Sequence, residues 1–173
     1  MGWFNSVLNY FFGAKPMAQT TVPSAPLEAE PTSAPPAPPA PRGVRNNNPG
    51  NIDRDNTEWE GMSPDQSSDP RFIVFTTPEY GIRALVKILQ SYQREGFKTI
   101  NEMIGRWAPS VENNTTAYQA FVAARVGVSG NVPIDLADPL LCESMVAAII
   151  AQENANYTYP RAVVQQGVAL AAS

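Results

Sequence analysis

The feature that most constrains the fold is a proline-rich stretch near the N-terminus, PTSAPPAPPAP at residues 31–41. Proline has no backbone N–H and fixes φ near −65°, so this stretch favours neither a helix nor a central strand. Together with the residues before it, it predicts a semi-rigid, polyproline-like linker over residues 16–41. The chain therefore divides into an N-terminal segment at 1–15, this linker, and a folded domain at 42–173.

The N-terminal segment carries large apolar side chains at helical spacing. They are Trp3, Val7, Leu8, Phe11 and Phe12, with polar residues between them. The segment is too short and too polar to span a bilayer. Because five large apolar side chains are unfavourable in water, we expect an anchor helix that docks into a partner protein or a membrane surface.

The composition excludes several kinds of chemistry. The 173 residues include no histidine and one cysteine, Cys142. This rules out Ser–His and Cys–His catalytic pairs, a disulfide within the chain and nearly every zinc site. We therefore expect no metal and no cofactor, and any catalysis must use carboxylates, amides, hydroxyls or arginines. A net charge of −4 also argues against nucleic acid as a partner, because that requires a basic face.

Three short segments at the start of the domain favour strands. RGVRNNNPGNIDRDN reads as a turn that leads into an extended segment at 51–54. FIVF at 72–75 predicts a second strand, and Trp59 is expected on or beside a third. These segments predict a small antiparallel sheet.

The rest of the domain predicts about five helices. Their start and stop signals place them from Pro78 to before Gly96, from Thr99 to before Pro109, over 115–126, from Pro139 through Glu153, and from near Pro160 to the end of the chain. A small sheet followed by these helices makes an α+β domain.

The helix that ends at Glu153 carries the main candidate for catalysis. Leu141, Met145, Ile149 and Glu153 are spaced four apart, so they share one helix face. An apolar face and the negative end of a helix both disfavour a charged carboxylate. A general acid that protonates a glycosidic oxygen needs such surroundings. The alternative is that the helix simply ends there and Glu153 turns out to water.

The sequence around Glu153, AIIAQENANYTYPRAVVQQG, resembles the catalytic helix of the lysozyme-like lytic transglycosylases. In that family an apolar helix ends in an Ala-x-x-x-Gln-Glu-Ser-type motif, followed by Asn, an aromatic residue, Pro and a second helix. The resemblance implies that Glu153 is the catalytic glutamate, whereas Asn154 stands where the family usually has serine. Tyr157 and Tyr159, in the loop beside Glu153, are the expected sugar contacts.

A second resemblance lies at the start of the domain. NNNPGNI, WEGM and FIVFTTPEYGIRAL are similar to segments that line the sugar cleft in the glucosaminidase branch of the lysozyme superfamily. The similarity implies glycan contacts by Asn47, Asn48, Asn51 and Tyr80. Asp53 would supply the second carboxylate that a hydrolase uses. Asp- and Asn-rich turns also bond their own backbone, so both interpretations of Asp53 remain open.

Residues 42–171 also resemble small phage virion proteins that open with RNNNPGNI and continue through RWAPSxENxT into a C-terminal ENxxxxY helix. In the enzyme families the glutamate helix precedes the Asn-rich strand, whereas here it follows. The resemblance therefore implies either a circularly permuted lysozyme-like fold or the loss of the catalytic acid.

The element pattern predicts an α+β fold with a small antiparallel sheet and about five helices, and the resemblances imply that this fold is lysozyme-like and that the chain is a phage virion protein. We expect it to degrade peptidoglycan as a lytic transglycosylase or glycoside hydrolase, acting in the bacterial periplasm or cell wall. Its expected partners are peptidoglycan and, through residues 1–15, other virion proteins or a membrane, but not nucleic acid. The alternative is a non-catalytic virion protein that uses the fold for binding or assembly.

Overall fold

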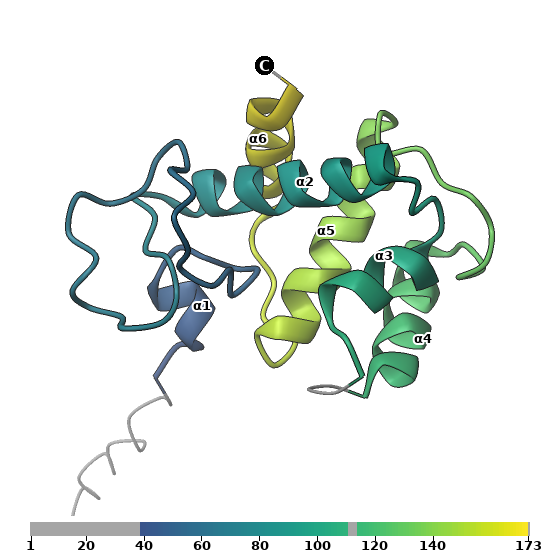
Figure 1. Cartoon of the computed structure of the whole chain (residues 1–173), viewed down its shortest axis with the longest axis horizontal. Coiled ribbons are helices and arrows are strands. Elements are labelled where there is room, and N and C mark those ends of the chain that lie inside the picture. Colours follow the sequence, from purple (N-terminus) through teal and green to yellow (C-terminus); the bar gives the residue numbers. More distant parts are fainter. Residues whose placement is uncertain (1–38, 111–113, 173) are drawn as a thin grey trace, which may run out of the picture. The chain divides into compact units, whose positions relative to one another are not determined.

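The computed structural model describes residues 39–110 and 114–172. The predicted anchor at 1–15 and most of the predicted linker at 16–41 lie outside the described residues. Within the described ranges the chain forms six helices and no strand (Figure 1). The helices are α1 (Arg42–Arg45), α2 (Pro78–Glu95), α3 (Ile100–Trp107), α4 (Thr115–Val126), α5 (Pro139–Glu153) and α6 (Arg161–Ala172). None of these six helices is long and apolar enough to cross a membrane.

The predicted α+β fold with an antiparallel sheet is wrong, because the domain is mainly helical. The segments at 51–54 and 72–75 do lie beside each other, but they meet in one isolated bridge between Asp53 and Phe72. A second isolated bridge joins Met62 to Phe75. The extended segments are real, yet they do not continue into a ladder.

Side-chain amides explain why no ladder forms. The Asn48 amide donates to the backbone oxygens of Ile52 and Ile73, at 2.9 Å in each case. The Gln66 side chain accepts from the N–H of Val74 at 2.8 Å and donates to its C=O at 2.7 Å. The C=O of Ile73 and the N–H of Val74 are therefore bonded to side chains. The C=O groups of Ile52 and Val74 also accept from the backbone N–H groups of Ile73 and Ser63, and pairing stays limited to isolated bridges.

The five predicted helices are confirmed, and their ends follow local signals. Gly96, with φ of 105°, closes α2 in the left-handed conformation that glycine adopts without strain. Thr99 and Glu102 form a capping box at the start of α3. The Asp138 side chain accepts from the N–H groups of Leu140 and Leu141 and so caps α5. The short α1 was not predicted.

The helices share a hydrophobic core in which α2 is the central element. Its apolar stripe contains Ile82, Leu85, Val86 and Leu89, which are fully buried, and Tyr92, which is partly buried. In Figure 1, α6 lies against α2 and α5 runs beneath it. The close approach of α6 depends on Gly167, because a Cβ there would lie 2.5 Å from Cγ2 of Ile82.

A second, smaller cluster holds the long loop between α1 and α2. It is made of Ile52, Ile73, Phe75 and Ala84, of which only the last belongs to a helix. Trp107, at the end of α3, packs against both clusters. The two clusters therefore meet near the end of α3, and the candidate site lies at this junction.

Candidate functional site

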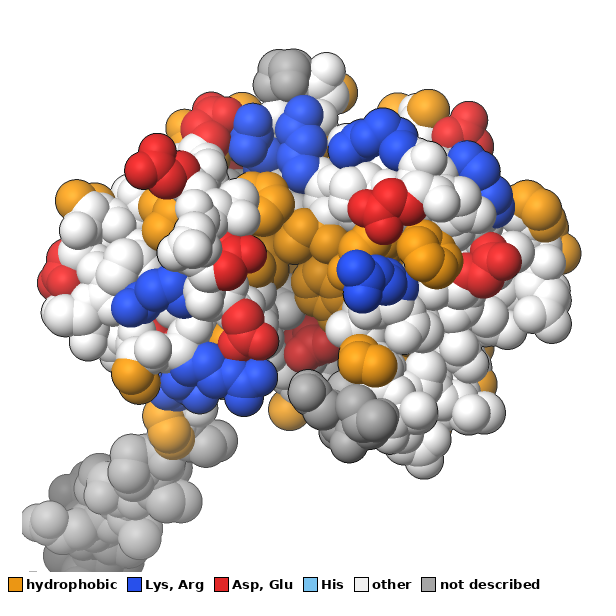
Figure 2. Space-filling model, viewed as in Figure 1, with side chains coloured by type: hydrophobic (Ala, Val, Ile, Leu, Met, Phe, Trp, Pro, Cys, Tyr) orange, Lys and Arg blue, Asp and Glu red, His pale blue; other side chains and the backbone are white. Residues whose placement is uncertain are grey.

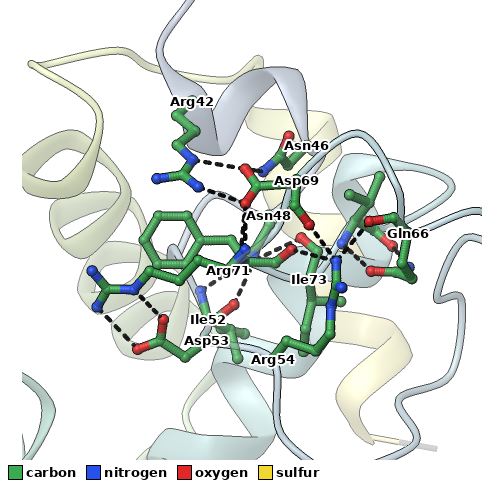
Figure 3. Close-up of polar contacts among 12 residues, drawn as sticks. Arg42, Asn46, Asn48, Ile52, Asp53, Arg54, Gln66, Asp69, Arg71 and Ile73 are labelled. Atoms are coloured by element: carbon green, nitrogen blue, oxygen red, sulfur yellow. Dashed lines mark hydrogen bonds and ion pairs between the residues drawn. The ribbon is translucent and has the colours of Figure 1, made fainter.

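A buried carboxylate organises the loop that forms one wall of the site (Figure 3). Asp69 is only 3% exposed and accepts two hydrogen bonds from the Arg42 guanidinium, at 2.7 and 2.6 Å. It also accepts from the Asn46 amide at 2.6 Å and from the backbone N–H groups of Arg71 and Phe72 at 3.0 and 2.9 Å. These donors, led by Arg42, lower the pKa of Asp69 well below its usual range.

Asp69 should therefore make the loop acid-sensitive. Because its pKa is lower in the folded state, its contribution to stability is present above the unfolded pKa of about 3.9. That contribution is lost as the pH falls below this value. We expect Asp69→Asn to lower the melting temperature at pH 7 by about 10 °C, since it leaves the bidentate arginine without its charged partner.

Urea unfolding at pH 7, 5, 4 and 3 checks the prediction for Asp69. The wild-type midpoint should fall between pH 5 and 3 by more than the midpoint of Asp69→Asn. The matched control is Asp53→Asn, because Asp53 also pairs with an arginine but is 60% exposed. Equal pH dependence in the wild type and Asp69→Asn would contradict the assignment.

The NNNPGN turn presents one asparagine to the site and uses two to hold itself together. Asn47 and Asn51 have positive φ, 51° and 49°, which asparagine tolerates better than most residues. The Asn47 amide donates to the backbone oxygens of Phe75 and Thr76. Asn48 is fully buried, and both ends of its amide bond to backbone. Asn51 is the member that reaches α5.

The C-terminal end of α5 is fastened to this turn. Asn154, 1% exposed, donates to the backbone oxygen of Pro49 at 2.7 Å and to that of Ile150 at 2.9 Å. The asparagine that replaces the serine of the transglycosylase motif thus joins the helix end to the turn. Gly43 packs directly against the Asn154 side chain, because a Cβ at residue 43 would lie 2.5 Å from Oδ1 of Asn154.

Glu153 is the last residue of α5, and its carboxylate is held by three donors. Oε1 accepts from the Tyr118 hydroxyl at 2.8 Å and from Nε1 of Trp107 at 3.1 Å. Oε2 accepts from the Asn51 amide at 3.2 Å. The donors come from α4, α3 and the turn after α1, so the carboxylate lies where three parts of the fold meet. Glu153 does not simply turn out to water.

A cleft of about 300 Å³ opens beside Glu153. Figure 2 shows a hollow in the middle of this face, with hydrophobic side chains at its back and charged side chains around its rim. The cleft is lined by Gly50, Asn51, Ile52, Asp53, Arg71, Phe72, Ile88, Tyr92, Trp107, Ala108 and Glu153. Its walls include residues from both hydrophobic clusters, so the cleft forms only where the two clusters pack against each other.

Tyr118 acts only as a donor. Its ring is buried in the core at 4% exposure, and burial, followed by the nearby charge of Glu153, raises its pKa far above the usual value. The phenol therefore keeps its proton and continues to donate to Oε1. Tyr118 thereby fixes the direction in which the Glu153 carboxylate points.

The second predicted catalytic residue, Asp53, also lines the cleft. It forms an ion pair with Arg71, with 2.6 Å between Oδ1 and Nε (Figure 3). Both side chains are about 60% exposed, so water and salt screen this pair. The structure thus brings Glu153, Asp53 and Asn51 together in one cleft.

The other predicted sugar contacts lie elsewhere. Tyr80 covers the turn at Gly61, where a Cβ would lie 2.0 Å from its ring. Tyr157 and Tyr159 pack edge to face at 5.0 Å between ring centres. Tyr159 lines a separate cleft with Glu143 and other residues, and burial raises its pKa to about 12. Since Asn47 and Asn48 hold the turn, only Asn51 of the six predicted contacts lines the site.

Three aromatic residues of the site were not assigned to it from the sequence. Trp107 and Tyr118 pack in the core while their polar atoms reach Glu153. Tyr92 lies on the apolar stripe of α2 and lines the cleft. Because a buried Trp or Tyr usually finds a hydrogen-bond partner for its polar atom, their apolar helix positions could have indicated a contact with a polar group such as Glu153. The described residues contain no group of three side chains suited to binding a metal ion.

The chain is similar to a known phage protein. It is 38% identical to Protein P5 of Pseudoalteromonas phage PM2 over 133 residues, which cover 74% of this chain and 80% of that protein. The chain therefore belongs to the family of Protein P5. This relationship supports the predicted place in the phage particle, and it carries no information on peptidoglycan degradation. No protein-family model matches the chain.

Proposed function

We propose that this member of the Protein P5 family is a component of the phage particle that cleaves the glycan strands of peptidoglycan. The observation that carries the proposal is the position of Glu153. Its carboxylate lies on the wall of a cleft, and three donors from separate parts of the fold fix its orientation. Catalytic acids and bases need this kind of preorganisation beside an open site.

In the proposed reaction Glu153 acts first as an acid. Its proton goes to the glycosidic oxygen as the bond from that oxygen to the sugar C1 breaks. The resulting carboxylate then takes a proton from the attacking hydroxyl. Tyr118 and Trp107 hold Oε1, and they steady the carboxylate in both protonation states.

The nucleophile distinguishes two routes. With Glu153 as the only working carboxylate, the 6-hydroxyl of the same sugar attacks C1 and leaves an anhydro end. If Asp53 is released from Arg71, it can activate a water molecule as a second carboxylate, and a reducing end results. Mass spectrometry of the released fragments separates the two products, because the anhydro end is lighter by one water molecule.

The test is a lytic assay on purified peptidoglycan with the full chain. A zymogram and a measurement of soluble fragments should both show activity. A folded sample that releases no fragments at any pH between 4 and 8 would contradict the proposed activity. Measurement of fragments also excludes an effect of binding alone.

One observation favours a second candidate, a non-catalytic virion protein that uses the cleft for binding. Both carboxylates of the cleft already have protein partners, since Glu153 has three donors and Asp53 has Arg71. Such groups serve a structural role as well as a catalytic one. The lytic assay separates the two candidates.

We further propose that residues 1–15 hold the protein in the particle through another virion protein or a membrane. Deleting them should abolish incorporation into particles, because their five large apolar side chains suit docking. The melting temperature should change little, since the proline-rich linker separates this segment from the domain in sequence. Immunoblots of purified particles and thermal unfolding check both parts. An unfolded deletion variant would contradict the three-part organisation.

A further inference from the structure

Two arginines at the cleft stack on rings that line it. The guanidinium carbon of Arg71 lies 4.9 Å from the centre of the Phe72 ring, and that of Arg106 lies 5.7 Å from the centre of the Tyr92 ring. Phe72 and Tyr92 both line the cleft. Arg71, in the loop before α2, lines the cleft itself, whereas Arg106, on α3, adjoins it through the ring of Tyr92. Figure 2 shows basic side chains around the hollow.

These arginines differ from Arg42, which also stacks on Phe72 but is held by Asp69. Arg71 forms an ion pair with the exposed Asp53, and an exposed pair of this kind contributes little to stability and is screened by salt. Arg106 has no carboxylate within salt-bridge distance among residues 39–110 and 114–172. Arg71 in the wall of the cleft and Arg106 beside it are both exposed side chains, so an incoming anion can reach them.

A neutral glycan makes little use of such groups. Sugar hydroxyls are bound by amides, carboxylates and aromatic faces, whereas a guanidinium matches the two oxygens of a carboxylate. Stacking on a ring also restricts each arginine before a ligand arrives, so the side chain loses less conformational entropy on binding. The pair therefore indicates a ligand with carboxylates on both sides of the cleft.

We propose that the cleft recognises a glycan strand that carries carboxylates, with Arg106 and Arg71 binding acidic groups of the peptide stems. This inference rests on the proposed function and narrows its substrate to carboxylate-bearing peptidoglycan. Neutral strands of N-acetylglucosamine lack these groups and should be poor ligands.

The test compares native peptidoglycan with the same material after its carboxylates are converted to methylamides by a carbodiimide and methylamine. Co-sedimentation of the full chain measures the affinity for each. We expect about tenfold weaker binding to the amidated material. Arg106→Gln should bind native material about fivefold more weakly than the wild type does. It should bind amidated material with the same affinity as the wild type.

The matched control is Arg125→Gln. Arg125 also stacks on an aromatic ring, 4.6 Å from the centre of Phe121, but neither residue lines the cleft. This variant should bind native material as the wild type does. The binding of the wild type should weaken between 50 and 300 mM salt, because exposed charges are screened (Debye length about 10 Å at 0.1 M).

The outcomes separate the inference from the proposed function. Equal binding to native and amidated material, an unchanged Arg106→Gln, or no binding to native material would overturn the inference. If carboxylates and Arg106 govern binding but no fragments are released, the inference stands and the proposed activity fails. If both materials are bound and cleaved equally, the activity stands and the inference fails.

Discussion

Glu153→Gln is expected to lower the rate of fragment release from peptidoglycan by at least about 100-fold, the share that a positioned acid–base group supplies. Glutamine has nearly the same shape, and its Oε1 can still accept from Tyr118 and Trp107. Its new N–H₂ group would face Asn51, whose Oδ1 is buried without a hydrogen-bond partner. Rotation of the Asn51 amide brings this oxygen to the new donor, so the fold should remain intact.

Circular dichroism and thermal unfolding check that Glu153→Gln is folded, and fragment release measures its activity. The matched control is Glu143→Gln, on the same helix. Glu143 pairs with Arg161 and lies outside the Glu153 cleft. It should retain the activity of the wild type. An unchanged rate in Glu153→Gln would remove Glu153 as the acid and leave Asp53 as the candidate within the cleft.

The sequence predicts the helices well because their signals are local. The ends of α2, α3 and α5 depend on residues within one turn, such as Gly96, the Thr99–Glu102 box and Asp138. The stripe from Leu141 to Glu153 on α5 is visible in the sequence spacing for the same reason. On this face Met145 and Ile149 are buried, and Glu153 at the helix end lines the cleft.

The sheet prediction fails because the competing interactions are side-chain amides. A pattern such as FIVF favours an extended segment, and the segment is extended. It does not reveal that the side-chain amides of Asn48 and Gln66 bond to the C=O of Ile73 and the N–H of Val74. A polar side chain in a turn has many possible partners, and only the folded chain shows which of them it meets.

The hydrogen-bond donors around Glu153 could not be predicted from the sequence either. Tyr118 and Trp107 are separated from Glu153 by 35 and 46 positions, and only tertiary packing brings their donors to one oxygen. The resemblance to glycosidases singled out Glu153 and Asn51, and the structure places their side chains 3.2 Å apart. It also suggested Tyr80, which instead packs on the turn at Gly61.

Gly43→Ala should disrupt the turn that reaches Glu153. A Cβ at this position would lie 2.5 Å from Oδ1 of Asn154, 2.7 Å from Oδ1 of Asn51 and 2.8 Å from the backbone oxygen of Asn48. Asn154 cannot retreat without losing its bond to Pro49, and a backbone oxygen cannot rotate away. We expect a loss of about 3 kcal/mol in the free energy of unfolding, as for severe overpacking.

The same change should also impair catalysis, because Asn51 is displaced from Glu153. Urea unfolding and fragment release measure the two effects on one sample. Gly105→Ala is the matched control, since a Cβ at this helical position meets only Nε2 of Gln119, at 3.6 Å. It should leave activity unchanged and raise stability by about 0.5 to 1 kcal/mol, as alanine does in place of glycine within a helix. If Gly43→Ala is as stable and as active as the wild type, the turn does not position Glu153 as the structure indicates.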